Sequence, residues 1–139
     1  MLWLLFALLT TLTWGIYDLL AKPMEENMNY FFALFIIGLL QVIIAVPFVI
    51  YAHYNGGLDY NSKGFLISSI MGILLGLGTV FFFYTFQYGG KASVAIPVYS
   101  VGVLIIGAIG GILFFKEAVD IKMILGFIAG IVSIVLLVR

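Results

Sequence analysis

The end of the chain carries the pattern that most constrains its fold. Two long apolar runs, Val94–Phe115 and Ile121–Val138, flank a short charged turn at Lys116–Lys122. A helix rises about 1.5 Å per residue, so each run is long enough to cross a hydrocarbon core roughly 30 Å thick. Backbone polar groups in lipid must be satisfied within their own element, so both runs should be helical. The sequence therefore predicts a transmembrane helical hairpin.

Composition extends this prediction to the whole chain. Of its 139 residues, 65% are hydrophobic and 9% are charged, whereas soluble domains carry roughly 25% charged residues. The chain has no cysteine and a formal net charge of zero, which excludes a disulfide framework and a thiolate metal site. The basic residues are scattered, so no nucleic-acid partner is expected. We predict an all-α integral membrane protein whose residues 1–139 form a single transmembrane domain.

Five apolar stretches predict five membrane-spanning helices. These are expected at about residues 2–22, 30–51, 64–88, 94–115 and 121–138. Pro23 should end the first helix, because proline cannot continue a helix from within. Pro97 allows two local structures: the fourth helix begins there, with proline in its first turn, or a longer helix from Ser93 bends at it.

Residues 92–139 also carry a family pattern. An Ala-Ser-Val-Ala-x-Pro-Val-Tyr-Ser opening is followed by a glycine-rich helix, Lys-Glu, a short turn and Gly-Phe-Ile-x-Gly-Ile. This order resembles the end of the repeat unit in drug/metabolite transporters, most closely in their EamA-like branch. Trp14-Gly15 and Lys22 extend the likeness to the start of the chain. The chain is also distantly similar to small multidrug resistance carriers.

The resemblance implies that this chain is half of a ten-helix inverted-repeat transporter. Full-length family members join two five-helix repeats, and an odd repeat makes the second copy inverted. A lone repeat would rebuild this plan by pairing antiparallel with another copy. The basic residues divide equally between the two predicted faces, Lys63, Lys116 and Lys122 against Lys22, Lys91 and Arg139. Positive-inside counting therefore allows either a dual orientation or a single orientation set by something other than charge.

Small residues form stripes on three of the predicted helices. Small side chains let transmembrane helices approach closely. The third helix carries Ser68, Gly72, Gly76 and Thr79 on one face, the fourth carries Gly107 and Gly111, and the last carries Gly126, Gly130 and Ser133. Packing within one bundle is the simpler interpretation of the first two stripes. For the last helix, similarity to the small multidrug carriers, which pair through their last helix, implies a homodimer interface at Gly126, Gly130 and Ser133.

Polar side chains at membrane depth are costly and usually mark a pathway. We predict a substrate-binding set of seven residues: Trp14, Tyr17, Asp18, Gln41, Tyr84, Tyr99 and Ser100. Asp18 has two interpretations, an interfacial ion pair with Lys22 or an ionisable group in the cavity. Gln41 could equally form a structural hydrogen bond between helices. An interfacial aromatic belt accounts for the other tyrosines, namely Tyr30, Tyr51, Tyr54 and Tyr88.

The chain departs from the multidrug carriers at one position that matters for their chemistry. Those carriers exchange protons on a glutamate in the first helix, but here the corresponding stretch, Leu9–Trp14, has no carboxylate. The resemblance therefore does not extend to proton antiport or export of cationic drugs. Glu117 matches a glutamate that follows the fourth helix in the family, and its place in the charged turn predicts a loop and capping role.

These observations favour transport over enzyme chemistry. His53 is the one histidine, and no nucleophile–base set, metal-ligand cluster or phosphate-binding loop is present in the sequence. We therefore predict no enzyme activity, no cofactor and no metal. The predicted function is a carrier subunit in the cell membrane that moves a small organic solute by alternating access, as a homodimer within the lipid bilayer. The alternatives are a non-transporting accessory or scaffold subunit and a lipid flippase.

Overall fold

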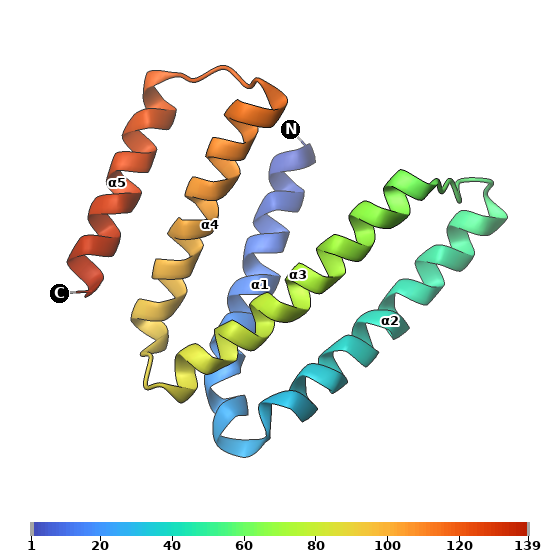
Figure 1. Cartoon of the computed structure of the whole chain (residues 1–139), viewed down its shortest axis with the longest axis horizontal. Coiled ribbons are helices and arrows are strands. Elements are labelled where there is room, and N and C mark those ends of the chain that lie inside the picture. Colours follow the sequence, from blue (N-terminus) through green and yellow to red (C-terminus); the bar gives the residue numbers. More distant parts are fainter. Residues whose placement is uncertain (1, 139) are drawn as a thin grey trace. The chain divides into compact units, whose positions relative to one another are not determined.

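The computed structural model describes residues 2–138. They form five α-helices, α1 (Leu2–Asn27), α2 (Tyr30–Tyr54), α3 (Ser62–Gln87), α4 (Ala92–Phe115) and α5 (Ile121–Val138), as Figure 1 shows. Arg139, one of the residues in the charge comparison, lies outside the described range. The chain divides into two compact units, residues 1–88 with α1 to α3 and residues 89–139 with α4 and α5.

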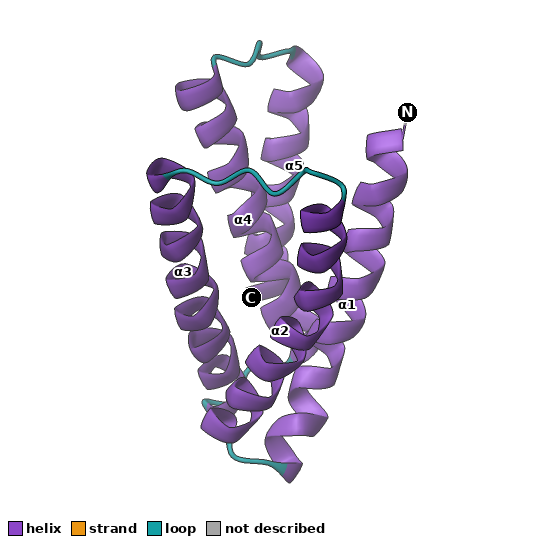
Figure 2. Ribbon diagram, turned by 90° about the vertical axis from the view of Figure 1, so that its right-hand side faces the viewer, coloured by secondary structure: helices purple, strands orange, loops and turns teal. Residues whose placement is uncertain are grey.

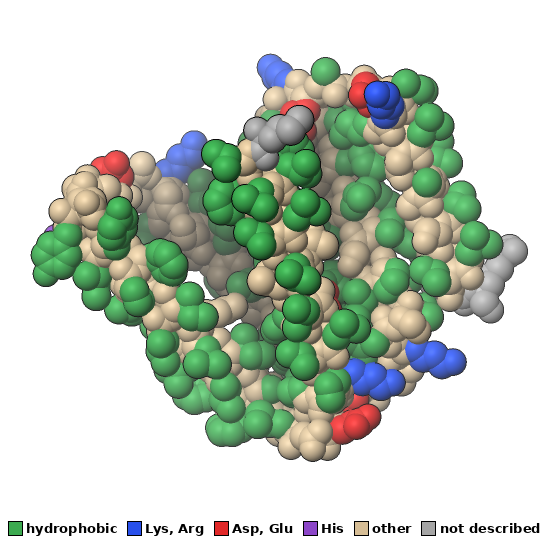
Figure 3. Space-filling view, turned by 180° about the vertical axis from the view of Figure 1, so that it is seen from behind, with side chains coloured by type: hydrophobic (Ala, Val, Ile, Leu, Met, Phe, Trp, Pro, Cys, Tyr) green, Lys and Arg blue, Asp and Glu red, His purple; other side chains and the backbone are tan. Residues whose placement is uncertain are grey.

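Four of the five helices are long and apolar enough to cross a membrane, and α5 is a shorter apolar helix. Its 18 residues rise roughly 27 Å, close to the thickness of the hydrocarbon core. In Figure 3 the charged side chains lie near helix ends and connecting loops, while the helix middles carry hydrophobic side chains. Among the described residues only four apolar side chains are buried. An apolar surface of this extent is stable only against lipid or other helices.

The first helix extends beyond its predicted end. The prediction that it ends at Pro23 is wrong, because α1 continues through Pro23 to Asn27. Proline removes only the N–H that would reach the Leu19 carbonyl, and the turns that follow are closed by other bonds. The Asn27 side-chain amide donates to the Pro23 carbonyl at 2.7 Å, and the Met28 N–H donates to the Met24 carbonyl at 2.9 Å.

Asparagine side chains cap the N-termini of the next two helices. Asn29 accepts a hydrogen bond from the Phe31 N–H at 2.9 Å at the start of α2. Asn61 accepts one from the Gly64 N–H at 2.7 Å at the start of α3. Asparagine is a strong N-cap residue because its side-chain oxygen satisfies a donor that the helix leaves unpaired. These caps explain why both helices begin where the polar loops end.

The α4–α5 hairpin agrees with its predicted bounds to within two residues. Helix α4 begins at Ala92, so Pro97 lies inside it; the alternative in which the helix begins at Pro97 is wrong. Asp120 caps the N-terminus of α5, because its carboxylate accepts a hydrogen bond from the Met123 N–H at 2.7 Å. The two helices run antiparallel, as Figure 1 shows.

Candidate functional site

The first unit is packed at one end and open at the other. Its buried apolar residues are Ala21 on α1, Ala33 on α2, and Phe83 and Phe86 on α3. All four lie near the α1–α2 connection, where the three helices converge in Figure 2. Towards the α2–α3 loop the same helices separate and their side chains are exposed. Any site within this unit is therefore closed at the α1–α2 end.

An aromatic cluster holds the closed end together. The Tyr30 ring stacks on Phe83 with centroids 5.9 Å apart and lies 6.3 Å from the Tyr84 ring. Tyr84 in turn lies 6.2 Å from Tyr88. The Glu25 side chain of α1 lies near the Tyr30 hydroxyl. These contacts tie the end of α1 to the start of α2 and the end of α3, and they place Tyr84 in the closure.

Three of the predicted substrate-binding residues share one face of α1. Trp14, Tyr17 and Asp18 are separated by three and four positions, the helical spacing of side-chain neighbours. Asp18 lies towards the closed end and is only 6% exposed, whereas Trp14, one turn further from that end, is 62% exposed. The polar face of α1 is therefore buried at Asp18 and exposed at Trp14.

Thr79 of α3 lies beside Tyr17, and its hydroxyl donates to the Leu75 carbonyl of its own helix at 2.8 Å. Thr79 lies one helical turn before Phe83, on the stripe that packs against α1 and α2. The sequence pattern placed Thr79 among small packing residues and did not predict its position beside Tyr17. The neighbour of a threonine in a membrane helix depends on how two helices that are distant in sequence cross. This crossing cannot be read from a single sequence.

Gln41 lies on the face of α2 that leads away from the closed end. Tyr30, Ala33, Ile37 and Gln41 follow one another at spacings of three and four, so they line one side of the helix. The first two pack against α3 or are buried, and Gln41 is exposed. Its amide therefore continues the inward face of α2 into the open half of the unit.

Two glycines of α3, Gly72 and Gly76, lie towards the open end of the first unit. A Cβ placed on Gly72 or Gly76 would meet no atom within 4 Å, so neither glycine forms a close helix contact in this chain. Both lie on the Thr79 stripe, nearer the open end. The predicted packing role therefore does not apply to these two positions here, and they leave space beside the polar face of α1.

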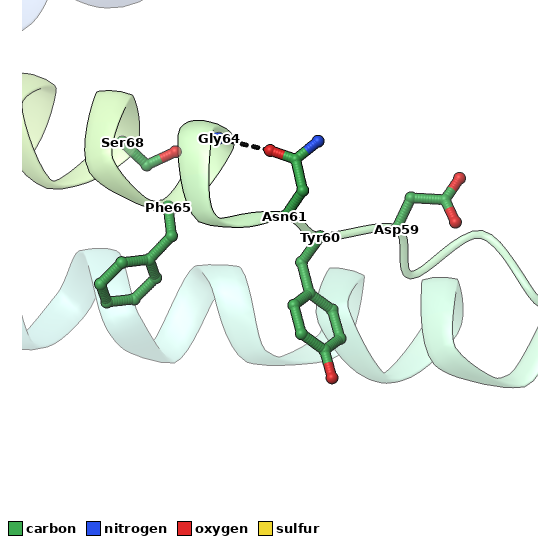
Figure 4. Close-up of a pocket in the computed structure, with 6 residues that line it drawn as sticks. All are labelled: Asp59, Tyr60, Asn61, Gly64, Phe65 and Ser68. Atoms are coloured by element: carbon green, nitrogen blue, oxygen red, sulfur yellow. Dashed lines mark hydrogen bonds between the residues drawn. The ribbon is translucent and has the colours of Figure 1, made fainter.

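A surface hollow of about 570 Å³ lies at the open end, next to the α2–α3 loop. It is lined by Asp59, Tyr60, Asn61, Gly64, Phe65 and Ser68. In Figure 4 the Tyr60 and Phe65 rings point to one side of the backbone, and the Asn61 oxygen is used in the cap of α3. The hollow is open and its aromatic side chains are largely exposed, so it forms a rim rather than an enclosed site.

The remaining predicted residues belong to the second unit. Tyr99 is half-buried and Ser100 is exposed on α4. Gly130 faces α4, because a Cβ there would lie 3.1 Å from the Val101 side chain, whereas one on Gly126 would meet nothing within 4 Å. Ser133 is exposed. The three small residues share one face of α5, which contacts α4 at Gly130 and is uncovered at Gly126 and Ser133.

Glu117 folds back onto α4. The Gly111 carbonyl accepts a hydrogen bond from the backbone N–H of Glu117 at 3.2 Å. A Cβ on Gly111 would lie 2.5 Å from a Glu117 carboxylate oxygen, so the side chain occupies the space that glycine leaves. Within residues 2–138 no three His, Asp or Glu side chains gather as a metal site would require.

Comparison with known proteins gives the family of this chain. The model of the EamA-like transporter family matches residues 1–139, the whole chain. An uncharacterized protein of Methanocaldococcus jannaschii is 27% identical over 134 residues, which cover 96% of this chain and 94% of that protein. No solved structure shows a significant match. With its apolar helices and a family match over its full length, the chain is an integral membrane protein that belongs to the EamA-like transporter family.

Proposed function

We propose that this protein is a carrier subunit that moves a small organic solute across the cell membrane by alternating access. The observation that carries the proposal is the polar face of α1, which is buried at Asp18 and exposed at Trp14. Polar groups at membrane depth are expensive unless they serve a pathway. A polar face that is closed at one end and open at the other is what one state of an alternating-access carrier requires.

The solute site is proposed within the first unit, on α1, α2 and α3. In the first unit, Trp14, Tyr17, Asp18 and Gln41 line the open half, and Tyr84 belongs to the aromatic closure that must open in the opposite state. Tyr99 and Ser100, on α4 of the second unit, remain predicted substrate-binding residues. The glycines at positions 72 and 76 support this placement, because they leave space beside the polar face of α1.

The working unit is an antiparallel homodimer. Five helices place the two ends of the chain on opposite faces of the membrane, so an inverted second copy supplies the other half of a ten-helix carrier. The equal division of basic residues between the two faces supports insertion in both orientations. The uncovered part of the small-residue face of α5, at Gly126 and Ser133, is the proposed seam between copies. Gly130 belongs to the hairpin, where it faces Val101.

Solute flux in liposomes tests the transport function directly. Purified protein is reconstituted and screened with labelled amino acids, sugars, nucleosides and organic cations, and the best solute is then used with variants. Trp14→Leu should lower the initial rate about tenfold, the loss of roughly 1.4 kcal/mol of solute stabilisation. Trp3→Leu is the matched control, since Trp3 lies on the same helix near its exposed start and should change the rate less than twofold.

Two results would overturn the carrier function. The first is absence of flux for every solute class from protein that is folded and correctly reconstituted. The second is equal loss of flux in the two tryptophan variants, because that would remove Trp14 from the site. Copurification with an unrelated membrane protein, without flux, would favour an accessory subunit, and movement of labelled phospholipid alone would favour a flippase.

A further inference from the structure

The hollow at the open end of the first unit has two chemically different sides. In Figure 4 the Asp59 carboxylate and the Asn61 amide lie on one side of the backbone, and the Tyr60 and Phe65 rings point to the other. Asn61 has an extended backbone conformation, and side chains of an extended segment alternate between its two sides. The hollow therefore joins a polar side to an aromatic side.

The polar side offers a donor next to a charged acceptor. The Asn61 side-chain oxygen accepts a hydrogen bond from the Gly64 N–H at 2.7 Å, so the nitrogen end of the amide is the end that can donate to a ligand. Asp59 is exposed, and its carboxylate is an acceptor with negative charge. Among the described residues that line the hollow, Asp59 carries the one charge, because Lys63 is not one of them. A matching ligand group combines a cationic donor with an acceptor.

The aromatic side continues into the apolar surface of α3. Tyr60 and Phe65 are largely exposed, and so are Leu66 and Ile70 in the turns that follow. The hollow lies where the α2–α3 loop meets α3, a helix long and apolar enough to cross a membrane. This places it at the boundary between water and lipid, where aromatic side chains are common. A ligand that reaches both sides has a polar head and an apolar body, as a membrane lipid does.

We infer that this hollow binds the headgroup of a phospholipid that carries a primary ammonium group. The ammonium donates to the Asp59 carboxylate, which has the opposite charge. The phosphate diester accepts from the Asn61 amide, and the acyl chains lie against Phe65 and the apolar surface of α3. A glycerol headgroup brings no positive charge to Asp59, and a trimethylammonium headgroup brings the charge without an N–H to donate. The inference is independent of the proposed solute site on α1.

Quenching of one engineered tryptophan measures lipid binding at the hollow. Tyr60→Trp, combined with Trp3→Phe and Trp14→Phe, leaves a single indole in the full chain, at the hollow. The protein in uncharged detergent micelles is titrated with brominated phosphatidylethanolamine, phosphatidylcholine or phosphatidylglycerol of identical acyl chains. Phosphatidylethanolamine should bind with a Kd about fivefold lower than phosphatidylglycerol, the upper range for an exposed ion pair, and phosphatidylcholine should fall between them. Equal binding of the three lipids, or tighter binding of phosphatidylglycerol, would overturn the inference.

Two variants of the polar side, made in the same single-tryptophan chain, assign the contacts. Asp59→Asn should abolish the preference for phosphatidylethanolamine. Asp120→Asn is the matched control, because it removes a carboxylate from another loop while asparagine can still cap α5, and its preference should be unchanged. A loss of preference in both variants, or in neither, would overturn the role of Asp59.

Asn61→Asp tests the contact with the phosphate. Aspartate keeps the oxygen that caps α3, but it replaces the donor with a second negative charge. Phosphatidylglycerol, which has no ammonium to compensate, should bind about threefold more weakly. Unchanged binding of phosphatidylglycerol would remove Asn61 from the site.

A headgroup without acyl chains separates a lipid from a dissolved solute. Glycerophosphoethanolamine carries the same ammonium and phosphate diester but is soluble in water. In molar excess it should leave the quenching by brominated phosphatidylethanolamine unchanged, because it lacks the contacts with the aromatic side. Displacement of the lipid at equal concentrations would overturn the lipid assignment. Failure of the flux experiment in liposomes would remove the carrier function and leave this site unaffected.

Discussion

At the scale of single residues, the end of α4 shows how one backbone conformation organises a turn. Lys116 adopts a left-handed conformation with φ of 55°, which costs an ordinary L-residue roughly 1–2 kcal/mol. The conformation directs the backbone N–H of Glu117 to the Gly111 carbonyl. It also brings the Glu117 side chain over Gly111, where only a glycine leaves room.

Glycine at position 116 should therefore stabilise the protein. Lys116→Gly relieves the backbone strain but adds freedom to the unfolded chain, so the expected gain in the free energy of unfolding is up to about 1 kcal/mol. Lys122→Gly removes the same charge from the helical part of α5 and should cost about 1 kcal/mol. Unfolding of the purified protein by titration with SDS measures both. A similar loss of stability in the two variants would contradict the strain at Lys116.

Individual contacts were the least predictable part of this site. The sequence identified the polar face of α1 by its spacing, because helical periodicity is a local property. It assigned Tyr30 to an interfacial belt, but Tyr30 stacks on Phe83 and contributes to the closed end. It assigned Thr79 to a packing stripe and did not predict that Thr79 lies beside Tyr17 of α1. Both contacts depend on the angle at which helices distant in sequence cross. Apolar stretches flanked by glycine are compatible with many crossing angles.

At the scale of elements, the helices themselves were predictable because lipid leaves the backbone little choice. The family of the chain was also predicted from its last third, and the match over residues 1–139 confirms it. The main error, the end of α1, came from applying to Pro23 a rule for isolated helices. Helix α1 continues across Pro23, and the turn that follows is closed by the bond from the Asn27 amide to the Pro23 carbonyl.

The two glycines of α5 provide a test of the seam. Gly126→Leu should weaken dimerisation in membranes, because a branched side chain on the uncovered part of the small-residue face holds two copies apart. Gly130→Leu should instead destabilise the hairpin, since it would meet the Val101 side chain. Crosslinking efficiency reports the first effect and thermal stability the second. Unchanged crosslinking in Gly126→Leu, with stability preserved, would place the seam on another helix.

At the scale of the whole molecule, the odd number of helices and the balanced charges raise the question of orientation. Lys and Arg in short loops near span ends determine which way a membrane protein inserts. Two added lysines in the loop at residues 55–61 should fix the N-terminus inside the cell. Two added beside Gly89 should fix the opposite orientation, because that turn lies on the other face.

The most direct test of the antiparallel carrier combines these two charge-fixed variants in one measurement of solute flux. Because the chain has no cysteine, one engineered at position 55 reports orientation through an impermeant maleimide in intact cells. We predict labelling of part of the unmodified protein, almost no flux from either variant alone, and restored flux when both are coexpressed. All-or-none labelling of the unmodified protein, or full flux from one charge-fixed variant alone, would contradict the antiparallel pair.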